Sequence, residues 1–184
     1  DNVRDGLLRM VWGFFLKIVI ADRAAILVNQ VFNYCNYYEG PTVLIAAVLF
    51  AFQVYGDFAG YSNIAIGAAQ VMGFKLMKNF ERPYLAVSVS DFWRRWHISL
   101  GAWFRDYVYI PLGGNRVSKP RWIFNIFVVW FLTGLWHGAA WNFAVWGLLY
   151  AVLLMNEKLW GLNLLKKSKI ISHAYVCLLY TSDA

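Results

Sequence analysis

The sequence predicts an all-α protein, a polytopic transmembrane helical bundle with an interfacial amphipathic helix. Three observations support this class. Of the 184 residues, 60% are hydrophobic and only 15% are charged, whereas soluble domains average about 45–50% apolar and about 25% charged residues. Ten Trp, 11 Tyr and 14 Phe are present, and such rings collect at membrane–water interfaces. Two long stretches are almost free of charge. This composition excludes a disordered chain, a nucleic-acid-binding tail and a disulfide scaffold.

The two uncharged stretches are residues 40–74, in which Asp57 is the sole charge, and residues 122–156, which contain none. A spanning helix needs roughly 20 residues, and one straight helix of 35 residues would extend about 52 Å against a hydrocarbon core of about 30 Å. Each stretch is therefore expected to tilt strongly, break or turn back. The glycines that offer breaks are Gly56 and Gly60 in the first stretch and Gly134 and Gly138 in the second.

A third apolar run, Met10–Phe32, is interrupted by Lys17, Asp22 and Arg23. It is interpreted either as a helix whose charges face protein or as a helix lying partly in the interface. Asp57 is interpreted as a buried carboxylate that pairs with a basic residue of another helix.

The distribution of positive charge predicts the orientation. Residues 74–121 carry nine Lys and Arg against three acids, whereas residues 33–41 carry only Glu39. Because basic loops stay on the cytoplasmic side, we expect residues 74–121 inside and residues 33–41 outside. The lysines from Lys158 onward also favour the inside, so residues 122–156 should cross an even number of times or follow a re-entrant path.

An amphipathic helix is expected to begin at Asp91, with Ser90 as its N-cap. Apolar side chains recur at spacings of four, four, three and four, and Pro111 with the Gly113–Asn115 turn ends the segment. Aromatic rings mixed with arginines suit a helix that anchors at the headgroups or lines a cytoplasm-facing cavity. The aromatic stripe consists of Phe92, Trp96, Leu100, Trp103 and Tyr107, and the arginines are Arg94, Arg95 and Arg105.

Two histidines are candidates for chemistry. His97 follows Arg94 and Arg95, whose charges favour the neutral imidazole, the form able to accept a proton. His137 lies in the middle of the second uncharged stretch, where an ionisable group is costly and usually faces a protein-lined or water-filled cavity. The alternative for His137 is a structural histidine that bridges two helices. His173 is expected to be an exposed histidine of the tail.

Five segments resemble the membrane-bound O-acyltransferase family, in the order that the family shows. They suit its bacterial branch, and the ending PLGGNR is most similar to the alginate O-acetyltransferase subgroup. The resemblance covers residues 1–160 as a partial catalytic core, while residues 161–184 form a tail whose last residues do not resemble native coding sequence. The absence of an initiator Met and of a signal peptide leads us to expect a fragment, inactive alone. The matching segments are Tyr55–Gly67, Phe80–Tyr84, Asp91–Leu100, Trp103–Arg116 and Leu132–Asn142.

The resemblance implies a multi-pass enzyme of the bacterial inner membrane that passes an acetyl group from a cytoplasmic thioester, acetyl-CoA or an acyl carrier, toward an exported polysaccharide. It implies that His137 is the catalytic residue, that His97 is a second family histidine, and that a separate extracytoplasmic acetyltransferase completes the transfer. No bound cofactor, metal ion or nucleic acid is expected. Membrane lipid is expected as a partner. The residues considered for binding the donor are Arg94, Arg95, Arg105, Asn142 and Asp57.

Three other functions stay open on the sequence. The chain resembles the D-alanyl transferases of cell-wall polymers less well than the acetyltransferases. An intramembrane His and Asp also suit a proton-coupled transporter, and a noncatalytic membrane scaffold is the third possibility. The acceptor polymer is open among alginate, cellulose and peptidoglycan-linked glycans.

Overall fold

The computed structural model describes residues 2–161, 172–173 and 175–176, which form helices and turns and, within these ranges, no strand. The chain divides into two compact units, one ending at Asn79 and the other beginning at Phe80. The predicted all-α class is confirmed for these residues.

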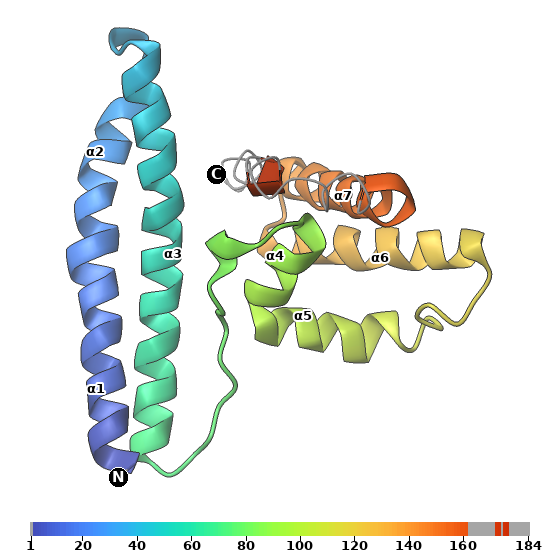
Figure 1. The fold of residues 1–184 in the computed structure, drawn as a ribbon, viewed down its shortest axis with the longest axis horizontal. Coiled ribbons are helices and arrows are strands. Elements are labelled where there is room, and N and C mark those ends of the chain that lie inside the picture. The colour runs from blue at the N-terminus through green and yellow to red at the C-terminus, as the bar shows by residue number, and fades with distance from the viewer. Residues whose placement is uncertain (1, 162–171, 174, 177–184) are drawn as a thin grey trace. The chain divides into compact units, whose positions relative to one another are not determined.

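The first unit is a helical hairpin (Figure 1). Its first arm is one continuous helical run made of α1 (Asn2–Phe14), the π-helical segment η1 (Phe15–Ala21) and α2 (Asp22–Asn33). After the short 3-10 turn η2 (Cys35–Tyr37), α3 (Gly40–Val71) returns alongside the first arm. The 32 residues of α3 form one unbroken helix, so the breaks expected at Gly56 and Gly60 are wrong.

Those glycines serve helix packing instead. A Cβ placed on Gly13 would lie 2.7 Å from the carbonyl oxygen of Gly60, and one on Gly60 would lie 2.8 Å from the carbonyl oxygen of Gly13. Gly6 and Gly67 face each other in the same way, and Gly56 packs against the backbone near the end of η1. Small residues let membrane helices approach to backbone contact. The glycines of α3 therefore bring its neighbour close, and the helix continues through them.

The charges of this unit pair with one another. The ammonium of Lys17 lies 2.8 Å from a carboxylate oxygen of Asp22 and 2.6 Å from one of Asp57. Asp57 does pair with a basic residue of another helix, but the expectation that its carboxylate is buried is wrong, because its side chain is 56% exposed. Lys17 and Asp22 pair with protein charges while their side chains stay 41% and 49% exposed. The three charges therefore connect the two arms of the hairpin.

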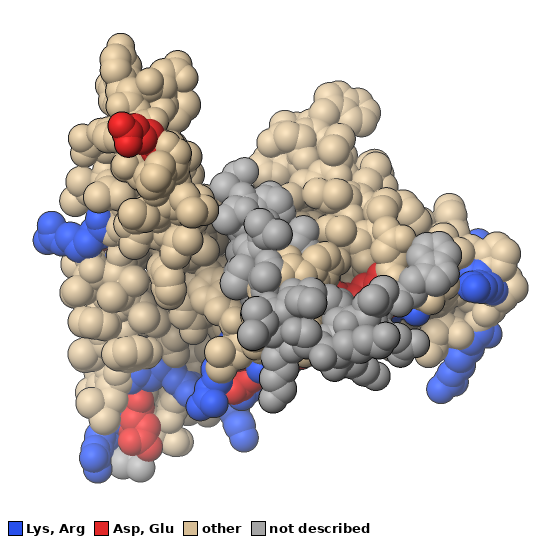
Figure 2. Space-filling model, turned by 45° about the horizontal axis from the view of Figure 1, so that its top comes forward, with Lys and Arg blue, Asp and Glu red and all other residues tan. Residues whose placement is uncertain are grey.

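Of the helices in the described ranges, α3 alone is both long and apolar enough to cross a membrane by itself. Its surface carries large exposed apolar side chains, and most of the visible surface of this unit is neither acidic nor basic (Figure 2). The exposed apolar residues of α3 include Leu44, Ile45, Val48 and Phe52. The prediction of further crossings remains a prediction.

The second unit is built on the antiparallel pair α6 (Lys119–His137) and α7 (Trp141–Asn156). The chain turns back at Gly138, so the expectation that residues 122–156 turn back is confirmed. The break expected at Gly134 is wrong, because α6 continues through this residue. Ile126 of α6 packs on Ala151 and Met155 of α7 at the end of the pair far from this turn. The other elements of the unit are the 3-10 turn η3 (Pro83–Leu85), α4 (Val89–Arg95), α5 (Ile98–Phe104) and the π-helical segments η4 (Arg105–Tyr109) and η5 (Glu157–Gly161).

The single amphipathic helix expected from Asp91 is wrong in two respects. Ser88, rather than Ser90, is the N-cap, since its hydroxyl oxygen accepts a hydrogen bond from the Asp91 N–H at 3.0 Å. The helix also breaks into α4 and α5 at His97, whose φ of 48° is left-handed. The break divides the aromatic stripe: Phe92 and Trp96 are buried, whereas Trp103 and Tyr107 are exposed.

Candidate active site

His97 lies at the corner between α4 and α5. Its φ and ψ of 48° and 51° place it in the left-handed region, which is uncommon for a residue other than glycine although histidine visits it more often than most. Its carbonyl oxygen accepts a hydrogen bond from the Gly101 N–H at 3.1 Å, which begins α5. The side chain is half-buried. Backbone outliers of this kind concentrate at functional sites.

His137 is the last residue of α6, and its side chain is exposed beside the turn into α7. Its ring packs against two indoles, with centroids 5.1 Å from Trp136 and 5.0 Å from Trp146. The His97 ring contacts the same Trp136, with centroids 5.6 Å apart. Two imidazoles that lie 40 positions apart in the sequence therefore meet at one indole. We call His97, Trp136, His137 and Trp146 the two-histidine site.

An aromatic cluster attaches the His97 segment to the α6–α7 pair. Trp93 of α4 lies with its ring centroid 4.9 Å from that of Trp130, 5.8 Å from Trp146 and 5.1 Å from Tyr150. The edge-to-face geometry of these pairs is the arrangement that aromatic rings favour. Because Trp146 also contacts His137, the cluster links both histidines to one packed core.

A cavity of about 450 Å³ opens beside His97, which we call the His97 cavity. Its wall is mostly apolar and is formed by residues of α4, α5, η4 and α6, with Leu154 from the last turn of α7 and Lys158 from η5. Pockets of this size suit small organic ligands. Among the described residues, His97 is the one histidine in the lining, and His137 lies outside it. The cationic residues that border it are Arg94, Arg105 and Lys158.

The cations of this cavity are close enough to influence one another. Burial, and then the positive charge of Arg94, lower the pKa of Lys158, while the charge of Glu157 acts in the opposite sense. Arg105 is partly neutralised, because its guanidinium donates to both carboxylate oxygens of Asp106 at 2.7 and 3.0 Å. An anionic group placed between Arg94 and Lys158 would relieve their repulsion.

Two buried polar atoms in the cavity residues lack a hydrogen-bond partner. They are the hydroxyl oxygen of Ser90 and the indole nitrogen of Trp93. Buried polar atoms are normally satisfied. A ligand with a carbonyl or hydroxyl group could therefore form hydrogen bonds that the described protein atoms do not.

Two features of its surroundings favour the neutral form of His97. Burial, followed by the nearby His137, lowers the pKa of His97 to about 4. The neutral imidazole expected from the sequence is thus favoured, but its causes are burial and His137 rather than Arg94 and Arg95.

Comparison with known proteins identifies the family of the chain. The family model described as membrane-bound O-acyltransferase matches residues 1–174. The chain belongs to the membrane-bound O-acyltransferase family.

Three relatives illustrate the range of this family. The chain is 44% identical over 89% of its length to a protein of Pseudomonas syringae pv. tomato named "Probable alginate O-acetylase AlgI". It is 40% identical over 83% of its length to a peptidoglycan O-acetyltransferase of Helicobacter pylori. It is 32% identical over 84% of its length to a teichoic acid D-alanyltransferase of Bacillus subtilis. The chain spans 31%, 29% and 41% of these proteins, about a third of their length.

The structure brings together some of the residues proposed for the site from the sequence and separates others. The two histidines meet at Trp136, and Arg94 and Arg105 border the His97 cavity. Arg95 instead binds Asp91 at 3.0 Å. Asn142 is exposed in the first turn of α7, and Asp57 belongs to the first unit, paired with Lys17. Of the donor-binding candidates, the cavity therefore retains Arg94 and Arg105.

Sequence reasoning missed three residues of this unit. Glu157 and Lys158 are the first charges after the 35 uncharged residues, a position that could have indicated an anchoring role. Asn125 is fully buried, and its amide nitrogen donates to the carbonyl oxygens of Leu112 and Gly114, both at 3.1 Å. It thereby holds the PLGG turn against α6.

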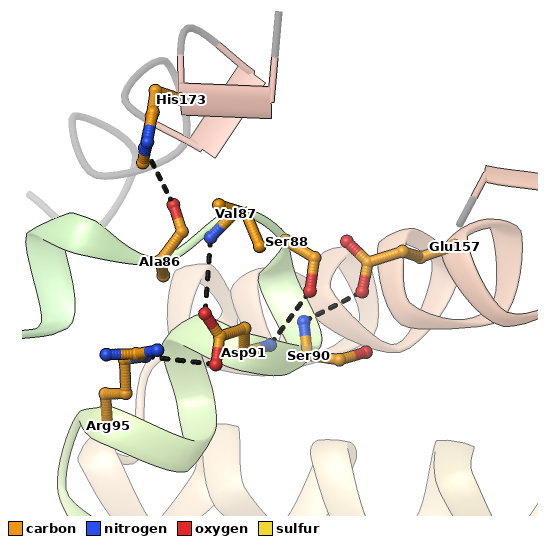
Figure 3. Close-up of polar contacts among 8 residues, drawn as sticks. All are labelled: Ala86, Val87, Ser88, Ser90, Asp91, Arg95, Glu157 and His173. Atoms are coloured by element: carbon orange, nitrogen blue, oxygen red, sulfur yellow. Dashed lines mark hydrogen bonds and ion pairs between the residues drawn. The ribbon is translucent and has the colours of Figure 1, made fainter. Parts of the chain in front are cut away.

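The tail prediction for His173 is also wrong. His173 is half-buried, and its ring nitrogen Nδ1 lies 3.2 Å from the carbonyl oxygen of Ala86 just before α4 (Figure 3). The rest of the predicted tail, residues 162–171, 174 and 177–184, lies outside the described residues.

The lowered pKa of His97 predicts a pH-dependent stability. Between the unfolded pKa of about 6.5 and the folded pKa of about 4, the unfolded chain binds more protons, so stability falls as pH decreases through this window. We expect His97 to contribute about 1 kcal/mol of the loss between pH 7 and pH 5, after allowance for solvent screening. Thermal unfolding of the complete protein at both pH values should show a smaller loss in His97→Gln. An equal loss in both proteins would contradict the pKa assignment.

Proposed function

We propose that the complete protein transfers an acetyl group from a cytoplasmic thioester, acetyl-CoA or an acyl carrier, toward hydroxyls of an exported polysaccharide such as alginate. The observation that carries the proposal is the contact of His97 and His137 with one indole, beside a cavity bordered by cations. The alginate O-acetylases among the relatives, at 44% identity, support acetyl as the group transferred.

Each residue has a defined task in this reaction. The hydroxyl oxygen of the acceptor attacks the thioester carbonyl carbon, the C–S bond breaks, and the thiolate leaves. His137 accepts the hydroxyl proton and returns it to the thiolate. Neutral His97 donates a hydrogen bond to the carbonyl oxygen, where negative charge develops. Arg94 and Lys158 bind phosphate groups of the donor by charge-assisted hydrogen bonds.

The proposal places the enzyme in the bacterial inner membrane as a multi-pass protein. The donor arrives from the cytoplasm and the acyl group leaves on the outside, where a separate acetyltransferase partner completes transfer to the polymer. D-alanyl transfer is the alternative within the family, because a teichoic acid D-alanyltransferase is 32% identical to the chain.

Transfer from labelled donors tests this proposal. Membrane vesicles that contain the complete protein, its extracytoplasmic partner and the polymer are supplied with acetyl or D-alanyl thioesters carrying isotope in the acyl group. We expect base-labile acetyl label in the polymer and little D-alanyl label. Preferential D-alanyl labelling would support the alternative. Proton flux without acyl turnover would replace the proposal with the transporter hypothesis.

A further inference from the structure

Glu157 is a buried acid that joins the end of the α6–α7 pair to the segment carrying His97. The residue is 2% exposed. Its Oε1 accepts a hydrogen bond from the Val89 N–H at 2.6 Å, and its Oε2 accepts one from the Ser90 N–H at 2.8 Å; the second is drawn in Figure 3. These partners lie 68 and 67 positions away in the sequence. Hydrogen bonds from N–H groups to a carboxylate are among the stronger ones in proteins.

Through these bonds α4 is held at both ends. Glu157 accepts its first two N–H groups, and Ser88 accepts the third, from Asp91. At the other end, the carbonyl oxygen of Arg95 accepts a hydrogen bond from the Glu81 N–H at 2.9 Å. A seven-residue helix is too short to be stable by itself, so its direction depends on these contacts and on the packing of Trp93.

The direction of α4 decides where the cavity residues lie. Trp93 and Arg94 are part of α4, and His97 follows two residues after its end. His137, by contrast, is held by Trp146 of α7, the helix that leads directly into Glu157. A shift of α4 against the start of η5 would therefore change the separation of the two imidazoles.

We propose that Glu157 is a positioning residue that sets His97 against His137, an inference that rests on the proposed acyl transfer. The carboxylate acts through α4 and does not touch the reacting atoms. Misplacement of a reacting group by about 1 Å can cost on the order of 100-fold in rate. The effect of losing Glu157 should accordingly appear mainly in kcat, with a smaller rise in KM, because Arg94 of the same helix borders the donor cavity.

The first test is Glu157→Gln in the complete protein, in the acetyl-transfer assay. The amide keeps one acceptor oxygen, and its NH₂ group then faces a backbone N–H instead of accepting from it. We expect normal abundance in the membrane and kcat lower by about tenfold, with a smaller rise in KM for the donor thioester, because Arg94 moves with α4. Glu39→Gln is the matched control, because Glu39 is exposed in the first unit, and it should match the wild type.

A second variant keeps the negative charge of residue 157 and shortens its reach. The side chain of Glu157→Asp is one methylene shorter, so its carboxylate cannot keep both hydrogen bonds, to the Val89 and Ser90 N–H groups, unless α4 shifts. We expect a fall in kcat, again with a smaller change in KM. This variant tests the positioning role if Glu157→Gln is not recovered as folded protein.

A double substitution separates positioning of His97 from a general loss of structure. In a His97→Gln background, Glu157→Gln should lower kcat little further, because residues that act through one another are not additive. Normal kcat in the folded variants, or a full additional tenfold loss in this background, would overturn the positioning role. Absence of acetyl transfer by the wild-type protein would instead overturn the proposed function.

Discussion

Replacing His137 by alanine in the complete protein should lower the turnover of acetyl transfer by about 10²–10⁴-fold, the range that a general base contributes. The effect should fall on kcat, because the ring lies outside the lining of the His97 cavity. The substitution removes the ring that packs between Trp136 and Trp146. It leaves both indoles in place, so the fold of the α6–α7 pair should survive.

The measurement is the initial rate of acetyl transfer per unit of folded protein. His173→Ala is the matched control, since this histidine contacts the Ala86 carbonyl outside the two-histidine site, and it should retain most of the activity. Normal turnover of His137→Ala at normal abundance would refute the assignment of the base.

Arg94→Gln should give the complementary pattern. If Arg94 binds donor phosphate, this variant should show a several-fold higher KM for the donor with kcat nearly unchanged.

Gly134→Ala should destabilise the protein by about 1–3 kcal/mol, the usual range for overpacking. A Cβ on Gly134 would overlap the carbonyl oxygen of Phe143 and lie 3.3 Å from the Cα of Gly147. Gly147 is equally crowded, because its Cβ would overlap the carbonyl oxygen of Trp130. Backbone atoms cannot move aside as a flexible side chain can, so α6 and α7 would have to separate.

Gly101→Ala is the control for this substitution. It is also a helical glycine, but the nearest atom to its Cβ would be the Trp93 carbonyl oxygen at 3.9 Å. In open space the exchange should be neutral or stabilising, by up to about 1 kcal/mol, because alanine is the better helix former. Thermal unfolding and protease resistance should therefore show a clear loss of stability in Gly134→Ala and no loss in Gly101→Ala. Equal stability of Gly134→Ala and Gly101→Ala would show that the contact of α6 with α7 is looser than the structure indicates.

Sequence patterns predicted the helical class and the two histidines, but they misplaced several local features. The stripe that includes Phe92, Trp96 and Trp103 indicated one continuous helix. Side-chain periodicity, however, reports which face a helix would bury and cannot report a corner such as His97. Ser90 was a reasonable N-cap by residue type. In the structure Ser88 is the N-cap, and the Ser90 N–H instead donates to Glu157, which follows α7. Such a partner is invisible to any local pattern.

By itself the sequence determined that this chain is helical and rich in membrane-type segments, that it carries the motifs of its family, and that His97 and His137 are its candidate reactive groups. These properties depend on composition and on short runs of residues. Only the tertiary structure decided that the imidazoles meet at Trp136, that glycines such as Gly60 and Gly134 serve helix contact, and that Glu157 anchors α4. Such contacts join residues of different helices, and they form only when whole helices pack, because backbone proximity and burial are properties of the folded chain.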